Sequence, residues 1–136
     1  MTETRTAAIS LLQAVHARLA GDAGLVAMLG PGGIHDRLLP RPKLPAVVIG
    51  ELETRDLSTS TEAAEEHFLT LEVWTEGEGR RGAQEIAAKT IALLDDADLA
   101  LDGAVLVSLL RTVTRARREP KTRNYLVEIR FRAVTE

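Results

Sequence analysis

The stretch YLVEIRFRAVTE, residues 125–136, carries the clearest structural pattern in this sequence of 136 residues. Its first eight positions alternate between two sets, Tyr125, Val127, Ile129 and Phe131 in one and Leu126, Glu128, Arg130 and Arg132 in the other. Successive side chains of a β-strand point to opposite faces, so this alternation predicts a strand with one buried and one largely polar face. A strand of this kind belongs to a sheet that is covered mainly on one side.

The rest of the chain supplies partners for this strand. Further strands are predicted at residues 46–51 (AVVIGE), 67–74 and 105–114, and amphipathic helices at 3–20, 23–29 and 84–94. Asp22 is suited to cap the second helix and Gly30-Pro31 to end it. Residues 31–45 are expected to form a loop with a short extended piece around Ile34, and residues 54–66 a polar loop. The order predicts an α+β fold, a mainly antiparallel four-stranded sheet with two to three helices packed on one face, in one domain spanning residues 1–136.

Composition excludes several classes of protein. A net charge of −3 argues against a general nucleic-acid binder, and an aromatic content of 3% leaves few platforms for stacking bases. The absence of cysteine excludes disulfides and thiolate metal sites. No apolar run approaches the ~20 residues of a membrane span, and the N-terminal stretch MTETRTAAIS does not resemble a secretory signal. A soluble, cytoplasmic protein is expected.

A glycine-rich turn raises the alternative of a nucleotide-binding domain. Gly77, Gly79 and Gly82 follow the order G-x-G-x-x-G, with acids at Asp95, Asp96 and Asp98. Three features argue against this alternative. The preceding strand is polar on one face, and the acids come before any second strand. In addition, the carboxylates of Glu76 and Glu78 lie inside the turn. The favoured interpretation is a flexible connection between a strand and a helix, with no cofactor bound.

Catalytic and metal-binding patterns are not found. His16, His35 and His67 have no spacing typical of metal ligands, and His16 is expected on a helix flank and His67 at the start of a strand. Ser58 and Ser60 lie outside any G-x-S-x-G elbow. We therefore predict neither catalytic residues, nor a metal site, nor a cofactor.

Charge patterning points instead to contacts with other proteins. A basic hairpin tip is expected between the last two strands, with Arg115, Arg117, Arg118, Lys121 and Arg123 around Pro120. An acidic counterpart is formed by Glu62, Glu65, Glu66, Glu72, Glu76 and Glu78. A solvated turn whose charges prevent edge pairing is an alternative of about equal weight for the tip, and a phosphate contact is another. If copies met head to tail, the two surfaces would be complementary and could close a ring.

Several strings together resemble the tail-completion or tail-terminator proteins of long-tailed bacteriophages, prophages and gene transfer agents. They are LPAVVIGELETRDLSTSTEAAEEHFLTLEVW, QEIAAKTIALL, DLALDGAVLVSLL and VEIRFRAVTE, and they cover most of the chain. The most characteristic features are Pro45, the loop from Arg55-Asp56 to Thr61, Glu66-His67, Trp74 and Phe131-Arg132.

This resemblance implies a structural protein, assembled in the bacterial cytoplasm into a phage-like particle. Such proteins form a ring, expected to be a hexamer, on the head-proximal end of the tail tube. The ring ends tube polymerisation, and each copy contacts other copies of the chain, the tube protein and the neck or head-tail connector protein. DNA passes through the lumen as cargo, and no membrane is involved. A neck adaptor or stopper is the alternative within this class. The candidate contact residues are Arg55, Asp56, Thr59, Glu62, Glu65, Glu66, Arg115, Arg117, Arg118, Lys121 and Arg123.

Overall fold

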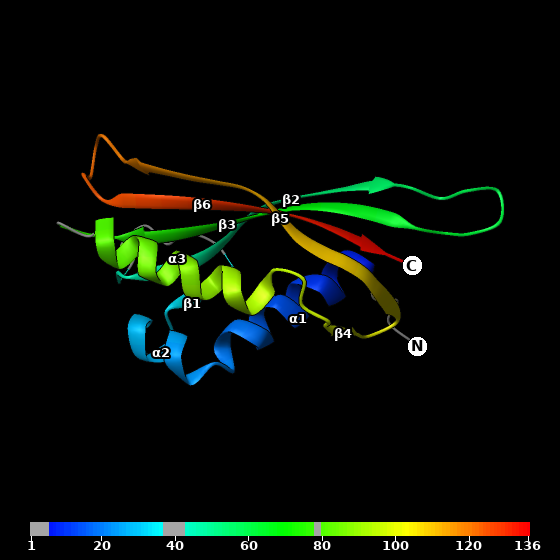
Figure 1. Cartoon of the computed structure of the whole chain (residues 1–136), viewed down its shortest axis with the longest axis horizontal. Coiled ribbons are helices and arrows are strands. Elements are labelled where there is room, and N and C mark those ends of the chain that lie inside the picture. The colour runs from blue at the N-terminus through cyan, green and yellow to red at the C-terminus, as the bar shows by residue number, and fades with distance from the viewer. Residues whose placement is uncertain (1–5, 37–42, 78–79) are drawn as a thin grey trace.

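The fold is a helix layer packed on one face of a curled β-sheet (Figure 1). The computed structural model describes residues 6–36, 43–77 and 80–136. Within these residues there are three helices, α1 (Ala7–Ala20), α2 (Ala23–Leu29) and α3 (Arg80–Leu94). The strands are β1 (Ile34–His35), β2 (Ala46–Asp56), β3 (Glu65–Thr75), β4 (Ala100–Leu101), β5 (Ala104–Arg118) and β6 (Tyr125–Thr135). The α+β class and the packing of helices on one face are as predicted.

The sheet has six strands in the order β1-β2-β3-β6-β5-β4, so the prediction of four strands was incomplete. The four long strands form an antiparallel sheet, as expected. The two additional strands are only two residues long and lie at the edges, where β1 pairs with β2 in parallel and β4 with β5 antiparallel. Strands this short carry little periodic signal, although the extended piece expected around Ile34 is β1.

The helices begin and end at residues whose chemistry explains the boundaries. The Asp22 carboxylate accepts a hydrogen bond of 2.9 Å from the backbone N–H of Leu25, which caps α2 as predicted. Gly30 follows α2 with a φ of 81°, a conformation that glycine adopts at little cost. Helix α1 is capped by Thr6 at the N-terminus, while the predicted start at residue 3 lies outside the described residues. Helix α3 starts at Arg80, four residues earlier than expected, and takes in Gly82.

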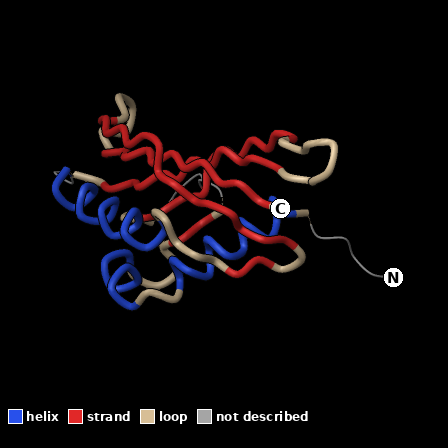
Figure 2. Tube along the Cα trace, turned by 45° about the vertical axis from the view of Figure 1, so that its right-hand side comes forward, coloured by secondary structure: helices blue, strands red, loops and turns tan. Residues whose placement is uncertain are grey.

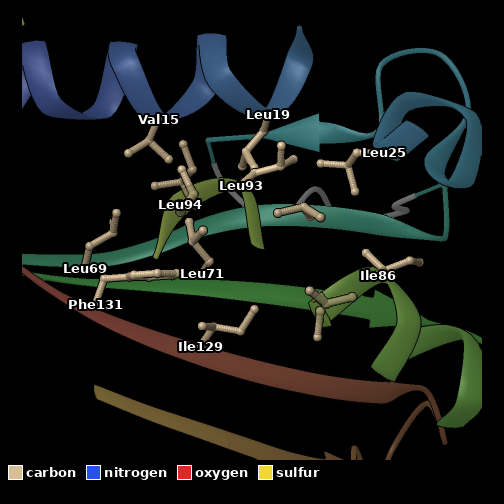
Figure 3. Packing of buried hydrophobic residues seen from close by; sticks show 14 of the residues in the cluster. Val15, Leu19, Leu25, Leu69, Leu71, Ile86, Leu93, Leu94, Ile129 and Phe131 are labelled. Carbon is tan, nitrogen blue, oxygen red and sulfur yellow. The ribbon is translucent and has the colours of Figure 1, made fainter. Parts of the chain in front are cut away.

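One core joins the helices to the sheet (Figure 3). The face of the sheet that carries Leu71 and Ile129 packs against the helices, and both side chains are fully buried. The alternation of residues 125–131 is confirmed, since Val127, Ile129 and Phe131 all belong to this core. The opposite face, here called the open face, is covered by no described helix (Figure 2). One corner of it holds a small cluster of Val48, Trp74 and Leu126.

Candidate assembly surfaces

The glycine turn lies between β3 and α3, and its surroundings differ from a dinucleotide-binding unit. Gly77 has a φ of 69°, Gly82 lies inside α3, and Gly79 is outside the described residues. Strand β3 runs antiparallel to both of its neighbours, β2 and β6. A dinucleotide-binding unit instead requires parallel strands joined through the helix. The topology therefore argues against the nucleotide-binding alternative and agrees with a plain connection.

His67 has a structural environment. It lies inside β3 and is completely buried, whereas the sequence placed it at the start of a strand. Its Nδ1 is 2.9 Å from Thr54 Oγ1, and its Nε2 is 2.9 Å from Thr135 Oγ1. Burial lowers the pKa of His67, while the charge of Glu65 acts in the opposite direction. Both ring nitrogens are engaged, so the imidazole links three strands. In the described ranges, no three His, Cys, Asp or Glu side chains are grouped to bind a metal ion.

The distal part of the β2–β3 hairpin, residues 51–66, is called the acidic arm. It holds six acidic residues and one basic residue, a formal charge of −5. The arm brings together the candidate contact residues Arg55, Asp56, Thr59, Glu62, Glu65 and Glu66. Residues 54–56 and 65–66, expected in a loop, are paired strand residues, which leaves a loop of residues 57–64. Of the other predicted acidic residues, Glu72 and Glu76 lie toward the far end of β3, and Glu78 lies outside the described residues.

The loop of the acidic arm is held by its own hydrogen bonds. The Asp56 carboxylate accepts a bond of 2.9 Å from the N–H of Ser58, and hydrogen bonds from the Ser58 side chain and backbone lower the pKa of Asp56. Leu57 N–H donates to Ala64 O at 2.8 Å, and Thr59 N–H to Glu62 O at 2.8 Å. The loop is therefore a defined protrusion with exposed side chains.

Three charged residues of the acidic arm, Glu53, Arg55 and Glu66, form ion pairs within the chain. The Arg55 guanidinium bonds Glu53 at 2.6 Å, which raises the pKa of Arg55, and it lies over the Phe68 ring at 5.1 Å. Glu66 is bridged by Arg132 at 2.7 Å, across β3 and β6. The Arg55–Glu53 pair is exposed, and a pair of this kind adds about 1 kcal/mol or less to stability. The main effect of these ion pairs is to fix the directions of the side chains on the open face.

The second surface, residues 111–123, is called the basic arm. It holds six basic residues and one acidic residue, a formal charge of +5. The predicted hairpin tip was placed too early in the chain: Arg115, Arg117 and Arg118 belong to β5, and only Lys121 and Arg123 lie in the turn. The predicted strand of residues 105–114 is thus four residues longer at its end. Arg115 and Arg117 therefore lie on the open face and Arg118 on the other face of the sheet, instead of surrounding a tip.

Contacts within the chain also orient the basic arm. Arg117 lies 3.4 Å from Glu128, whose other oxygen is 3.8 Å from Arg130. Arg118 lies over the Tyr125 ring at 4.6 Å, and Arg80 from α3 over the same ring at 5.5 Å. Sequence reasoning missed Arg80, because only the fold brings the start of α3 beside Tyr125. Positioned cations over an aromatic ring are worth roughly 0.5–1 kcal/mol each at exposed sites.

The two arms lie at opposite ends of the molecule. In Figure 1 the loop of the acidic arm is at the right-hand end, and the β5–β6 turn of the basic arm is at the upper left. The described part of the chain is therefore electrically polar along its long axis, despite its small net charge. Such a separation of charge suits head-to-tail contacts between copies, because the facing ends then attract.

The open face between the arms is hollowed and partly apolar. A hollow of about 420 Å³ is lined by residues of all four long strands, among them Glu53, Phe68, Arg130 and Val113. Along β5, Val105 and Val107 are 63% and 53% exposed. The sequence predicted a strand at residues 105–114 and did not single out these two valines.

Three comparisons with known proteins bear on these surfaces. A family model described as "Tail completion protein gp17" matches residues 13–136. A chain from a structure described as "Virion of native gene transfer agent (GTA) particle" is similar in fold, with a TM-score of 0.88 and 31% sequence identity. That match covers 98% of this chain and 99% of the other. A comparison with curated protein sequences found no match. In the described residues, no helix is long and apolar enough to cross a membrane.

Proposed function

Because the chain belongs to the tail completion protein gp17 family, a family of structural tail proteins and not of enzymes, we propose that it is a tail terminator. In this role it forms a ring, expected to contain six copies, at the head-proximal end of the tail tube of a phage-like particle. The ring ends tube polymerisation and joins the tail to the neck and head. Its contacts are with its own copies, the tube protein and the neck protein, and DNA passes through the lumen as cargo.

The observation that carries this proposal is the match of the family model over residues 13–136. The 31% identical chain from a gene transfer agent virion supports it, since that chain and this one cover each other almost completely. A single domain spanning residues 1–136 is part of the proposal. The separation of charge into an arm of −5 and an arm of +5 supports assembly of identical copies.

If DNA passes through the proposed ring, the charge of the inner surface of the ring is restricted. A wall with a large basic excess would bind the phosphate backbone and slow its passage. On the open face, Arg132 bonds Glu66 and Arg130 lies near Glu128, so basic side chains there have acidic neighbours. This balance is compatible with a lumen that does not retain its cargo.

Deleting the gene from the particle-producing strain and imaging the tails tests the proposal. The expected result is tubes of uncontrolled length together with tails that lack heads, restored by the gene in trans. Tails of normal length that fail to join heads would instead identify a neck adaptor or stopper. Particles indistinguishable from wild type would refute a role in tail completion.

A further inference from the structure

The two outer edges of the sheet are each covered along only part of their length by described residues. On the β2 side, β1 pairs with Val47 and Val48, and residues 49–56 have no described partner on the outer side. On the β5 side, β4 pairs with Ala104 and Val105, and the turn after α3 extends this cover. In that turn Asp96 N–H donates to Leu109 O at 2.8 Å, and the Asp95 carboxylate accepts from Arg111 N–H at 2.9 Å. Residues 112–118 of β5 therefore have an outer edge without a described partner.

We propose that the free edge of β2 in one copy pairs with the free edge of β5 in the next, so that the sheets of neighbouring copies join. This inference rests on the proposed ring and identifies the contact that builds it. Strands β2, β3, β6 and β5 alternate in direction. A second copy placed beside the first in the same orientation therefore brings its β2 antiparallel to β5. The pairing continues the hydrogen-bonding pattern of the sheet across the interface.

The direction of the backbone groups selects which residues can pair. Leu57 N–H points inward to Ala64 O at 2.8 Å, and Glu119 N–H points inward to Asn124 O at 2.7 Å. Because alternate residues of an antiparallel strand direct their backbone groups to opposite sides, Thr54 of β2 and Thr114 of β5 both direct theirs outward. Pairing Thr54 with Thr114 of the neighbour therefore makes two-way backbone hydrogen bonds.

This register also matches the side chains. It places Glu53 opposite Arg115 and Glu51 opposite Arg117 on the open face, with two acid-base pairs as the result. On the other face it places the half-buried Leu52 opposite Ala116, an apolar pair. Opposite charges and matched side chains directly across strands are the pairs that stabilise sheets.

Charge excludes pairing of like edges. Two β5 edges would set the arginines of residues 111–118 against one another, and two β2 edges would set Glu51 and Glu53 against their own copies. Charged residues on a strand edge often serve to prevent pairing, and here they prevent symmetric dimers. The acidic edge of β2 therefore pairs with the basic edge of β5 in the neighbouring copy, and the contact is head to tail.

The pairing also implies a tilt. Within one copy, Arg115 lies in a row with Glu128, Glu72 and Val48. Pairing Arg115 with the neighbour's Glu53 in place of Val48 displaces that copy along the strand by five residues of β2. The bulge between Ile49 and Leu52 makes these five residues span four of β3, so the displacement is about 14 Å. A closed ring built with such an offset needs strands inclined to the ring axis, as in a β-barrel.

Cysteine cross-linking tests the inference, because the chain has no cysteine of its own. The Glu53→Cys/Arg115→Cys double variant brings two thiols to a directly opposed pair between copies. The matched control is Glu53→Cys/Arg111→Cys, since Arg111 lies in the covered part of the β5 edge. Both doubles and each single variant are oxidised and run on non-reducing gels, as purified protein over a range of concentrations and as tail particles. Thermal unfolding of each variant checks the fold, because Glu53 also contacts Arg55.

The expected result is a ladder of disulfide-linked oligomers from the Glu53→Cys/Arg115→Cys variant, and monomers from the control and the single variants. Dimers from Arg115→Cys alone would show pairing of like edges and overturn the inference. Absence of the ladder from both protein and particles would also overturn it. In that case, aberrant tails in the deletion strain would leave the proposed function intact. Normal tails in that strain would remove the proposed function itself.

Discussion

Replacing Thr135 by valine tests the buried contact that links three strands. The change removes the hydroxyl that lies 2.9 Å from His67 Nε2 and keeps the β-branched shape that suits a strand. Thr135 is 1% exposed and His67 is fully buried, so water cannot take the place of the hydroxyl. A buried polar atom left without a partner costs about 1–3 kcal/mol of unfolding free energy.

The same substitution at Thr54 tests the other ring nitrogen. Its hydroxyl lies 2.9 Å from His67 Nδ1, and the ring of His67 is fully buried although Thr54 itself is exposed. Thr54→Val therefore also leaves a buried nitrogen without its hydroxyl partner, and the expected cost is again about 1–3 kcal/mol. Together the two valine variants test each of the two hydrogen bonds of the same imidazole separately.

Urea unfolding followed by Trp74 fluorescence measures both effects. Trp74 is the sole tryptophan and is 9% exposed, so unfolding changes its environment strongly. With an m-value of about 2 kcal/mol/M, a loss of about 2 kcal/mol lowers the urea midpoint by about 1 M. Equal midpoints for wild type and Thr135→Val would refute the structural role assigned to the His67 contact.

Three further predictions use the same unfolding assay. Burial holds the pKa of His67 below its unfolded value of about 6.5. The stability contributed by this difference is present above about pH 6.5 and is lost as pH falls below that value and through the lowered pKa, so His67→Gln should reduce the fall in urea midpoint between about pH 7.5 and about pH 5.5. Ile129→Ala, at a fully buried site, should cost about 2–5 kcal/mol, whereas Val107→Ala, at a site 53% exposed, should change stability by about 0.5 kcal/mol or less. Asp22→Ala removes the cap of α2 and should cost about 1 kcal/mol; an unchanged midpoint would mean that water caps the helix equally well.

Local chemistry determines the parts of the fold that the sequence predicts well. Helix α2 begins and ends as predicted, because Asp22 and Gly30 act through bonds and backbone angles close to them in the chain. The alternation of residues 125–131 predicts which side of β6 enters the core. These features depend on neighbouring residues alone, so a single sequence contains enough information to find them.

Non-local pairing determines the parts that the sequence misses. Residues 54–56 and 65–66 are polar and were predicted as loop, yet they are strands because Arg55 pairs with Glu66 and Asp56 with Glu65 across the hairpin. Register of this kind is a tertiary property. Residues 115–118 were likewise assigned to a turn on the strength of their charge, although β6 supplies them with backbone partners. The role of the candidate contact residues stays a prediction, and the sequence did not identify the strand residues among them.

The partial cover of each sheet edge bears on how an assembly of this chain would close at a defined number of copies. A head-to-tail contact closes a ring or grows without limit, and the outcome depends on a fixed rotation between copies. Two strand edges that are free along their whole length can slip in steps of two residues and keep each side chain on its original face, so the rotation is poorly defined. Strand β1 occupies one end of the β2 edge, and strand β4 and the Asp95 carboxylate occupy the diagonally opposite end of the β5 edge. A neighbour that slides along β5 toward residue 111 would meet an amide that Asp95 already holds, and the acid-base pairs of the proposed register would separate. Cover and charge would together leave one register, and a single register is the condition for a ring of defined size.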